Sequence, residues 1–300
     1  MEPLSDTEFA RKLSEVADRV TVALDQLIPP AQGPEADLMR AMRHAALANG
    51  KRMRPFYVIE TGCMFGASQK ALLRTAAALE CVHCYSLVHD DLPCMDNDDF
   101  RRGQPTVHKA FTEATAVLAG DGLLTLAFKI LASPETHQDP LIRLRLIERL
   151  ADAAGAQGMV GGQMIDMLEH NSPRDLGTIT RMQRMKTGEL IAYSIEAGAI
   201  IGGATEAENH ALYGFAHDLG LAYQIADDLM DAMGDEDEAG KPLRTDAGAG
   251  KVNFVTILGI DSARQRVRLL AAQARQHLAI FRNRANILLQ SVDFVLDRDH

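Results

Sequence analysis

The chain has 300 residues, 47% of them hydrophobic and 24% charged, which suits one large or two ordinary soluble domains. Its net charge of −10 disfavours nucleic acid or an anionic membrane as the main partner. The amino-terminal residues lack the basic and apolar segments of a signal peptide, so we expect a cytoplasmic protein.

Helical periodicity dominates the chain, and strand-like alternation is almost absent. The pattern predicts helices over 7–28, 36–49, 71–89, 114–132, 140–158, 173–203, 206–234 and 262–296. No repeat or low-complexity linker separates them. Charged residues such as Asp121 and Lys129 interrupt the most apolar stretches, so we expect no transmembrane span and no stable membrane association. We predict an all-α protein with a single domain over residues 1–300, a helical bundle around a deep central cavity.

The four cysteines do not suggest an extracellular disulfide framework. Cys81 and Cys84 have the C-x-x-C spacing, but no second pair completes a zinc site. The segment is typical of a helix interior, so a structural role is favoured over a redox or metal role.

Two aspartate clusters are the most informative feature of the chain. One contains Asp90, Asp91 and Asp96; the other contains Asp227, Asp228 and Asp231. Each lies at the end of, or inside, a mostly apolar helical pattern, where carboxylates repel one another and are costly to desolvate. Divalent cations offset that cost, and hard oxygen ligands suit Mg²⁺, which completes its shell with waters and phosphates. The clusters therefore indicate a Mg²⁺-dependent enzyme acting on a phosphorylated substrate; an acidic, solvated turn is the alternative for either cluster alone.

The two clusters differ in geometry. Gln224, Asp227, Asp228 and Asp231 share one helical face. Asp90 and Asp96 are about 240° apart on an ideal helix. Pro93 lies between these two and disfavours a regular helix, so we expect the chain to leave the helix before Asp96.

Basic residues adjoin glycines in sets that could hold diphosphates. Arginine donates to phosphate through a planar fork, and lysine acts as a mobile point charge. An isolated lysine or arginine is more often a solvated charge, but several of these sets also adjoin the acidic clusters. The candidates are Lys51, Arg52 and Arg54 after Gly50, Arg101 and Arg102 before Gly103, and Lys186, Lys241 and Lys251.

These motifs together resemble the trans-isoprenyl diphosphate synthases, in particular the short-chain bacterial farnesyl diphosphate synthases. The resemblance runs from about residue 40 to residue 298. Its marks are GKRMRP (50–55), HCYSLVHDDLPCMDNDDFRRGQPTVHKAF (83–111), AVLAGDGLL (116–124), GMVGGQMID (158–166), KTGEL (186–190), YQIADDLMDAMGD (223–235) and the GK pairs at 240–241 and 250–251.

The resemblance implies roles for individual residues. Three Mg²⁺ ions and the allylic diphosphate would bind through Asp90, Asp91, Asp96, Asp227, Asp228 and Asp231. Arg101, Lys186 and Lys241 would hold the allylic diphosphate, with Lys251 closing over it. The isopentenyl diphosphate would be held by Lys51, Arg54, His83 and Arg102. Thr187 and Gln224 would line the reacting region and stabilise positive charge.

The reaction implied is ionisation, condensation and elimination to a prenyl diphosphate. In the family, bulky residues four and five positions before the first aspartate form a floor that sets product length; here they are Ser86 and Tyr85. Tyr85 favours a fifteen-carbon product. On an ideal helix, however, Tyr85 lies about 140° from Asp90 and Ser86 only about 40°, so a twenty-carbon product is the alternative.

Two readings from other classes stay open. A class I terpene cyclase also has an aspartate-rich site, but it normally lacks the second motif and the Lys-Arg and Arg pair. A non-catalytic partner subunit tends to lose aspartates or arginines from these motifs, and this chain keeps them. The resemblance also implies a homodimer, for which the apolar helices at 114–132 and 140–158 could supply the interface.

Overall fold

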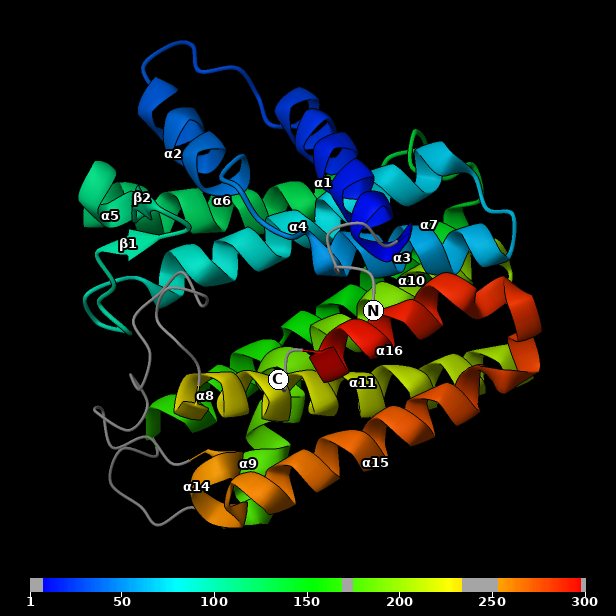
Figure 1. Cartoon of the computed structure of the whole chain (residues 1–300). Coiled ribbons are helices and arrows are strands. Elements are labelled where there is room, and N and C mark those ends of the chain that lie inside the picture. Colours follow the sequence, from blue (N-terminus) through cyan, green and yellow to red (C-terminus); the bar gives the residue numbers. More distant parts are fainter. Residues whose placement is uncertain (1–7, 169–174, 234–252, 298–300) are drawn as a thin grey trace. The chain divides into compact units, whose positions relative to one another are not determined.

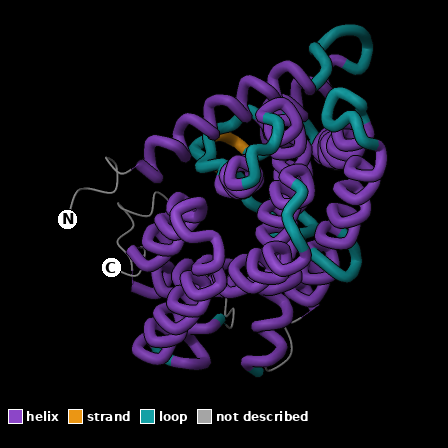
Figure 2. Tube along the Cα trace, turned by 90° about the vertical axis from the view of Figure 1, so that its right-hand side faces the viewer, coloured by secondary structure: helices purple, strands orange, loops and turns teal. Residues whose placement is uncertain are grey.

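The computed structural model describes residues 8–168, 175–233 and 253–297, and these form two compact units. The first unit runs to Arg149 and includes Ala197–Gly203; the second comprises Leu150–Glu196 and the residues from Ala204 onward. Figure 2 shows helix almost throughout the described chain, with one short strand pair. The all-α prediction is confirmed.

In the first unit, α4 is the central helix. It packs against α6, α3, α1 and α2, and α4 and α6 lie side by side in Figure 1. Most of its surface is covered, as expected for a helix that is apolar on all sides. The elements of this unit are α1 (Glu8–Leu27), α2 (Ala36–Ala46), α3 (Met53–Met64), α4 (Gln69–Asp90), β1 (Phe100–Arg101), β2 (Gln104–Pro105), α5 (Val107–Ala110), α6 (Glu113–Ala132) and most of α7 (Pro140–Ala154).

Helix α3 was not among the predicted helices. Every residue from Pro55 to Gly62 is buried, so the segment has no polar face and no helical periodicity to detect. Pro55 lies in the first turn, where a missing N–H costs nothing. Gly62 lets α4 approach closely, since a Cβ there would lie 2.1 Å from Leu72 Cδ2.

In the second unit, α11 packs lengthwise against α15 and also contacts α14 and α16. Buried alanine, leucine, isoleucine and phenylalanine side chains line its inner face. The elements are the end of α7, α8 (Met159–Leu168), α9 (Leu176–Gln183), the π-helical turn η3 (Arg184–Gly188), the start of α10 (Glu189–Gly202), α11 (Glu206–Met233), α14 (Phe254–Leu258), α15 (Ile260–Leu278), η4 (Ala279–Ala285) and α16 (Asn286–Asp297).

Helices α5, α8 and α14 were not predicted either, and four predicted helices differ in detail. The helix predicted over 36–49 ends at Ala46. The helix predicted over 140–158 ends at Ala154. The described part of 173–203 is helical but contains the π turn η3. The helix predicted over 262–296 begins at Ile260 and is broken near Arg282, whose φ of 51° is not helical.

Two of the described helices, α4 and α6, are long and apolar enough to cross a membrane by length and composition alone. In α4, 72% of the most apolar window is buried inside the protein, and in α6 the figure is 44%. A core helix passes the same test, so this observation is weak support for a membrane span.

Candidate active site

The first aspartate cluster lies where α4 ends. Asp90 is the last helical residue, and Asp91 caps the helix with its N–H donating to the carbonyl of Leu87 at 3.0 Å. The chain then turns back, so that the N–H of Asp96 donates to the carbonyl of Asp90 at 2.8 Å. The expectation that the chain leaves the helix before Asp96 is confirmed.

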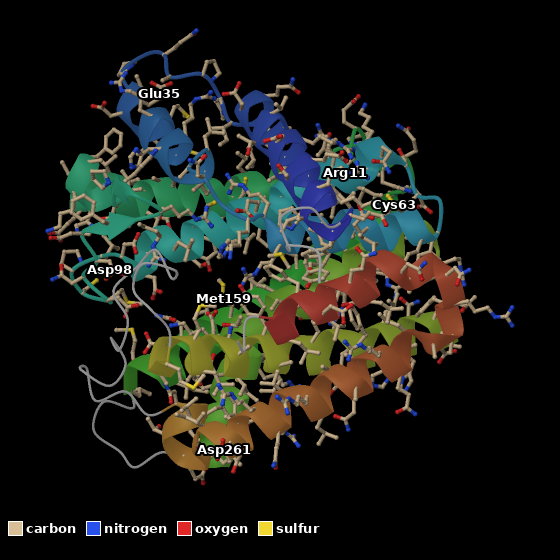
Figure 3. All side chains as sticks on the ribbon, viewed as in Figure 1. Arg11, Glu35, Cys63, Asp98, Met159 and Asp261 are labelled. Carbon is tan, nitrogen blue, oxygen red and sulfur yellow. The ribbon has the colours of Figure 1, made fainter. Side chains whose placement is uncertain are left out.

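A two-residue hairpin follows this turn. Arg101 pairs with Gln104 across it, and Arg102 and Gly103 at its tip have φ values of 53° and 76°. Positive φ at both central residues is the type I′ geometry that matches the twist of a hairpin. The buried hydroxyl of Thr106 secures the loop by donating to the carbonyl of Asp98 at 2.8 Å; Asp98 is labelled in Figure 3.

The hairpin brings Arg101 to the first cluster. Its Nε donates to Asp91 Oδ1 at 2.6 Å, and its Nη2 to Asp98 Oδ2 at 3.3 Å. Burial raises the pKa of Asp91, although the neighbouring Arg101 opposes the shift. Burial alone would lower the pKa of Arg101, but the charge of Asp91 outweighs it and the pKa is raised. Arg101 therefore supplies positive charge next to the carboxylates of Asp91 and Asp98.

Arg102 is directed to a different set of groups. A Cβ on Gly50 would lie 2.8 Å from Arg102 Cζ, so the missing side chain makes room for the guanidinium. Arg102 Nη2 also lies 3.5 Å from His83 Nε2. Burial lowers the pKa of His83 well below its usual value, and the charges of Arg54 and Arg102 lower it further. A neutral imidazole thus lies within a group of cations, a setting that attracts an anion.

Other predicted residues of the first unit surround these groups. Lys51 is exposed and Arg54 half-buried, on either side of the start of α3. Tyr85 is only 7% exposed, and its ring meets that of His89 edge-on at 5.7 Å between centroids. Ser86 donates to the carbonyl of His83 at 2.8 Å.

The second aspartate cluster lies on α11 in the second unit. Asp227 and Asp231 are half-buried, whereas Asp228 is 7% exposed. The Oδ2 of Asp228 accepts a hydrogen bond of 2.9 Å from the N–H of Phe254, the first residue of α14. Asp228 therefore also joins α11 to the start of α14. Asn253 caps that helix through a capping box with Thr256, a role that the sequence analysis did not identify.

Lys186 and Thr187 lie on the π turn η3. The Lys186 ammonium donates to Asp166 Oδ2 at 2.7 Å. The turn fits closely against α8, because a Cβ on Gly162 would lie 2.2 Å from the backbone nitrogen of Lys186. Asp166 is the last residue of the motif GMVGGQMID, but the sequence analysis did not identify it as a partner of Lys186. Gln224 lies half-buried on α11; Lys241 and Lys251 lie outside the described residues.

The donor set fits a hard divalent cation. Among the residues that the structure describes, no three histidine, cysteine, aspartate or glutamate side chains converge to enclose a metal by themselves. Carboxylates that supply only part of a coordination shell suit Mg²⁺, which retains waters and binds substrate phosphates.

Cys81 and Cys84 are buried and unpaired with each other, and burial raises the pKa of Cys84 to about 12, which keeps it a protonated thiol.

Comparison with known proteins identifies the class. The sequence pattern of the polyprenyl synthetase family matches residues 35–284. A farnesyl diphosphate synthase of Geobacillus stearothermophilus is 42% identical over all of both chains. A solved FPP/GFPP synthase from Zymomonas mobilis is 44% identical, with a TM-score of 0.88 over 96% of this chain and 98% of that one. A geranyltransferase from Helicobacter pylori, complexed with magnesium and isoprenyl diphosphate, is 30% identical, with a TM-score of 0.83 over 97% of each chain.

The chain belongs to the polyprenyl synthetase family. The relatives extend over its full length, and the motifs of both aspartate clusters lie inside the matched region.

Proposed function

We propose that this chain is a short-chain trans-prenyltransferase that condenses isopentenyl diphosphate with dimethylallyl and then geranyl diphosphate to give farnesyl diphosphate. The observation that carries the proposal is the hairpin at Arg101–Arg102. Its two consecutive arginines lie next to different groups. Arg101 donates to the carboxylate of Asp91, whereas Arg102 lies at Gly50 and His83. Two adjacent anion sites are what a reaction between two diphosphates requires. Farnesyl diphosphate synthases among the relatives support the same class.

The isopentenyl diphosphate site is assigned to Lys51, Arg54, His83 and Arg102. Arg102 and Arg54 supply charge, and His83, held neutral, can donate one hydrogen bond without further repulsion between cations. The exposed Lys51 reaches a diphosphate as a mobile point charge.

The allylic diphosphate is assigned to Arg101, Lys186, Lys241 and Lys251. Arg101 and Lys186 are paired with Asp91 and Asp166, respectively. These carboxylates hold the cationic side chains in place until an anionic substrate competes for them.

The metal ligands are assigned to Asp90, Asp91, Asp96, Asp227, Asp228 and Asp231, with Asp227 as a direct ligand. The site takes Mg²⁺, with three ions bound alongside the substrate. The relative from Helicobacter pylori, which is complexed with magnesium, supports the choice of metal but not the number of ions. When bound, Mg²⁺ supplies Lewis-acid stabilisation of a departing diphosphate.

The chain's own groups account for the remaining chemistry. Arg101 and Lys186 hold the allylic diphosphate as its carbon–oxygen bond breaks. The double bond of isopentenyl diphosphate then forms the new carbon–carbon bond with the allylic cation. Thr187 and Gln224 turn their dipoles toward that cation, and the proton released in the last step passes to the departed diphosphate, so no side-chain base is required.

We further propose a cytoplasmic homodimer. Large apolar side chains of the first unit are exposed on two neighbouring segments of the chain: Leu118 of α6 is 56% exposed, and Leu141 and Leu144 of α7 are 71% and 60% exposed. A second copy that covers them would remove apolar surface from water.

A product assay tests the proposed function. The purified chain is incubated with Mg²⁺, isopentenyl diphosphate and each of the C5, C10 and C15 allylic diphosphates, and the dephosphorylated alcohols are resolved by length. Farnesol as the main product is expected, and chelation of the metal should abolish it. Geranylgeraniol would retain the mechanism but change the product, whereas no product from any starter would overturn the proposal in favour of a non-catalytic subunit.

A further inference from the structure

Arg52 belongs to the basic segment 51–54, but its side chain cannot reach a substrate. The side chain is 1% exposed, in contrast to the exposed Lys51 beside it. Its Nη1 donates to Glu80 Oε1 of α4, whose side chain is also 1% exposed. The segment therefore contains one buried arginine, Arg52, between the exposed Lys51 and the half-buried Arg54.

The same guanidinium also holds the end of α2. Its Nη2 donates to the carbonyls of Ala46 at 2.7 Å and Ala48 at 2.8 Å. Ala46 is the last residue of α2, and carbonyls at a helix end have no partner inside the helix. One planar side chain thus connects α2 to α4 through three acceptors, a pattern that the fork of arginine fits and the single ammonium of lysine does not.

The backbone of Arg52 begins α3. Its carbonyl accepts from the N–H of Phe56 at 3.0 Å, and its φ of 51° is left-handed. Such a backbone is unfavourable for a residue with a side chain, and it persists where the surrounding structure determines it. The hydrogen bonds from the Arg52 side chain to Glu80, Ala46 and Ala48 provide those surroundings.

The short loop between α2 and α3 and the first turn of α3 carry groups assigned to isopentenyl diphosphate. Gly50 receives the Arg102 guanidinium, and Lys51 and Arg54 flank Arg52 on either side. A displacement of Arg52 would therefore move Lys51, Arg54 and the surface against which Arg102 packs.

We propose that the buried Arg52–Glu80 ion pair positions the loop at 47–51 for isopentenyl diphosphate, with Arg52 and Glu80 as positioning residues that do not touch the substrate. The inference rests on the proposed function. A buried ion pair adds little net stability compared with an apolar pair of similar volume, whereas loss of one partner leaves a costly unpaired charge. This asymmetry separates positioning from stability in an experiment.

The test compares Arg52→Met, Glu80→Met and the double variant Arg52→Met/Glu80→Met. Each single variant should melt at a lower temperature, because one charge is buried alone. The double variant should regain most of the melting temperature. Its KM for isopentenyl diphosphate should nevertheless stay raised by about 10- to 100-fold, since misplaced binding groups have effects of that order, while the KM for geranyl diphosphate changes by less than about twofold.

Trypsin cleavage after Lys51 gives a readout that does not need activity. The double variant should be cleaved faster than the wild type, because the loop has lost its attachment to α2 and α4. Glu60→Gln is the matched control: Glu60 is 7% exposed and accepts from Lys12 at 3.2 Å in the same unit. It should lower the melting temperature and leave both KM values and the cleavage rate unchanged.

An active double variant with wild-type KM for isopentenyl diphosphate and wild-type cleavage would overturn the inference and leave the proposed function intact. A wild-type chain that consumes no isopentenyl diphosphate would instead overturn the proposed function, and the substrate assigned to this loop with it.

Discussion

Tyr85 is the side chain through which product length can be tested. It is buried on α4, five positions before Asp90, with its ring against His89. If it forms the floor, Tyr85→Ala should shift the main product from fifteen carbons to twenty or more, because the removed ring leaves room for another prenyl unit. Alcohol chain lengths measured after dephosphorylation would show the shift, and Tyr85→Phe, which keeps the ring, should still give farnesol.

An unchanged product from Tyr85→Ala would rule out Tyr85 as the floor. In that case Ser86 becomes the candidate, since it lies closer to Asp90 around an ideal helix. Ser86→Phe would then shorten the product to ten carbons.

His83 should make stability depend on pH. Its pKa is lowered by burial and by neighbouring arginines, so between that lowered pKa and about 6.5 the unfolded chain binds a proton that the folded chain does not. The contribution is fully present above about pH 6.5 and is lost as the pH falls toward the folded-state pKa. Denaturant unfolding of His83→Gln should therefore show a smaller loss of free energy between pH 7 and pH 5 than the wild type. Equal losses in both proteins would contradict the assignment of this pH dependence to His83. His137→Gln serves as a control outside the cationic group.

At the scale of elements, the hairpin tip depends on Gly103. Its φ is 76°, and apart from Gly103 and its two chain neighbours no atom lies within 4 Å of the position where a Cβ would be. Gly66, after α3, has a φ of 71° and equally open surroundings. A β-branched residue is strained in this backbone region, so Gly103→Val and Gly66→Val should both lower the free energy of unfolding, by about 1–2 kcal/mol.

Only Gly103→Val should also impair catalysis. It displaces Arg101 and Arg102, and kcat/KM should fall by about tenfold or more, whereas Gly66→Val keeps wild-type steady-state kinetics. Equal kinetic losses in the two variants would mean that strain anywhere in the unit, and not the hairpin geometry, limits activity.

Sequence periodicity predicted the long helices and failed where that signal is absent or misleading. The amphipathic α1 lies within one residue of its predicted bounds over the described part of the chain. Helix α3 has no polar face, and the break near Arg282 and the π turn at Arg184–Gly188 are changes of backbone geometry within helix-forming sequence. Such changes follow from packing between segments, which a local pattern does not contain.

At the scale of the whole molecule, the charged motifs of the candidate site could be predicted, but their partners could not. Arg52–Glu80, Lys186–Asp166 and Asp228–Phe254 join residues 28, 20 and 26 positions apart. Glu80 did leave a signal, since it is an acidic residue between Leu79 and Cys81 in the apolar middle of α4. A buried carboxylate of this kind requires a cation, although the sequence does not say which one.

The exposed leucines of α6 and α7 give the last prediction, which concerns assembly. A stable dimer buries about 800 Å² on each partner around an apolar centre, and Leu118, Leu141 and Leu144 are exposed side chains of the kind that form one. Leu141→Glu/Leu144→Glu should be monomeric by light scattering at concentrations where the wild type is dimeric, because a carboxylate would be buried at the interface without a partner. Leu269→Glu on α15, at a position 49% exposed, should remain dimeric.

Dimer formation also links stability to concentration, so the melting temperature of the wild type should rise with protein concentration and that of the double variant should not. A wild-type chain that is monomeric over the micromolar range would contradict this interface and leave the condensation chemistry to be carried by one chain alone.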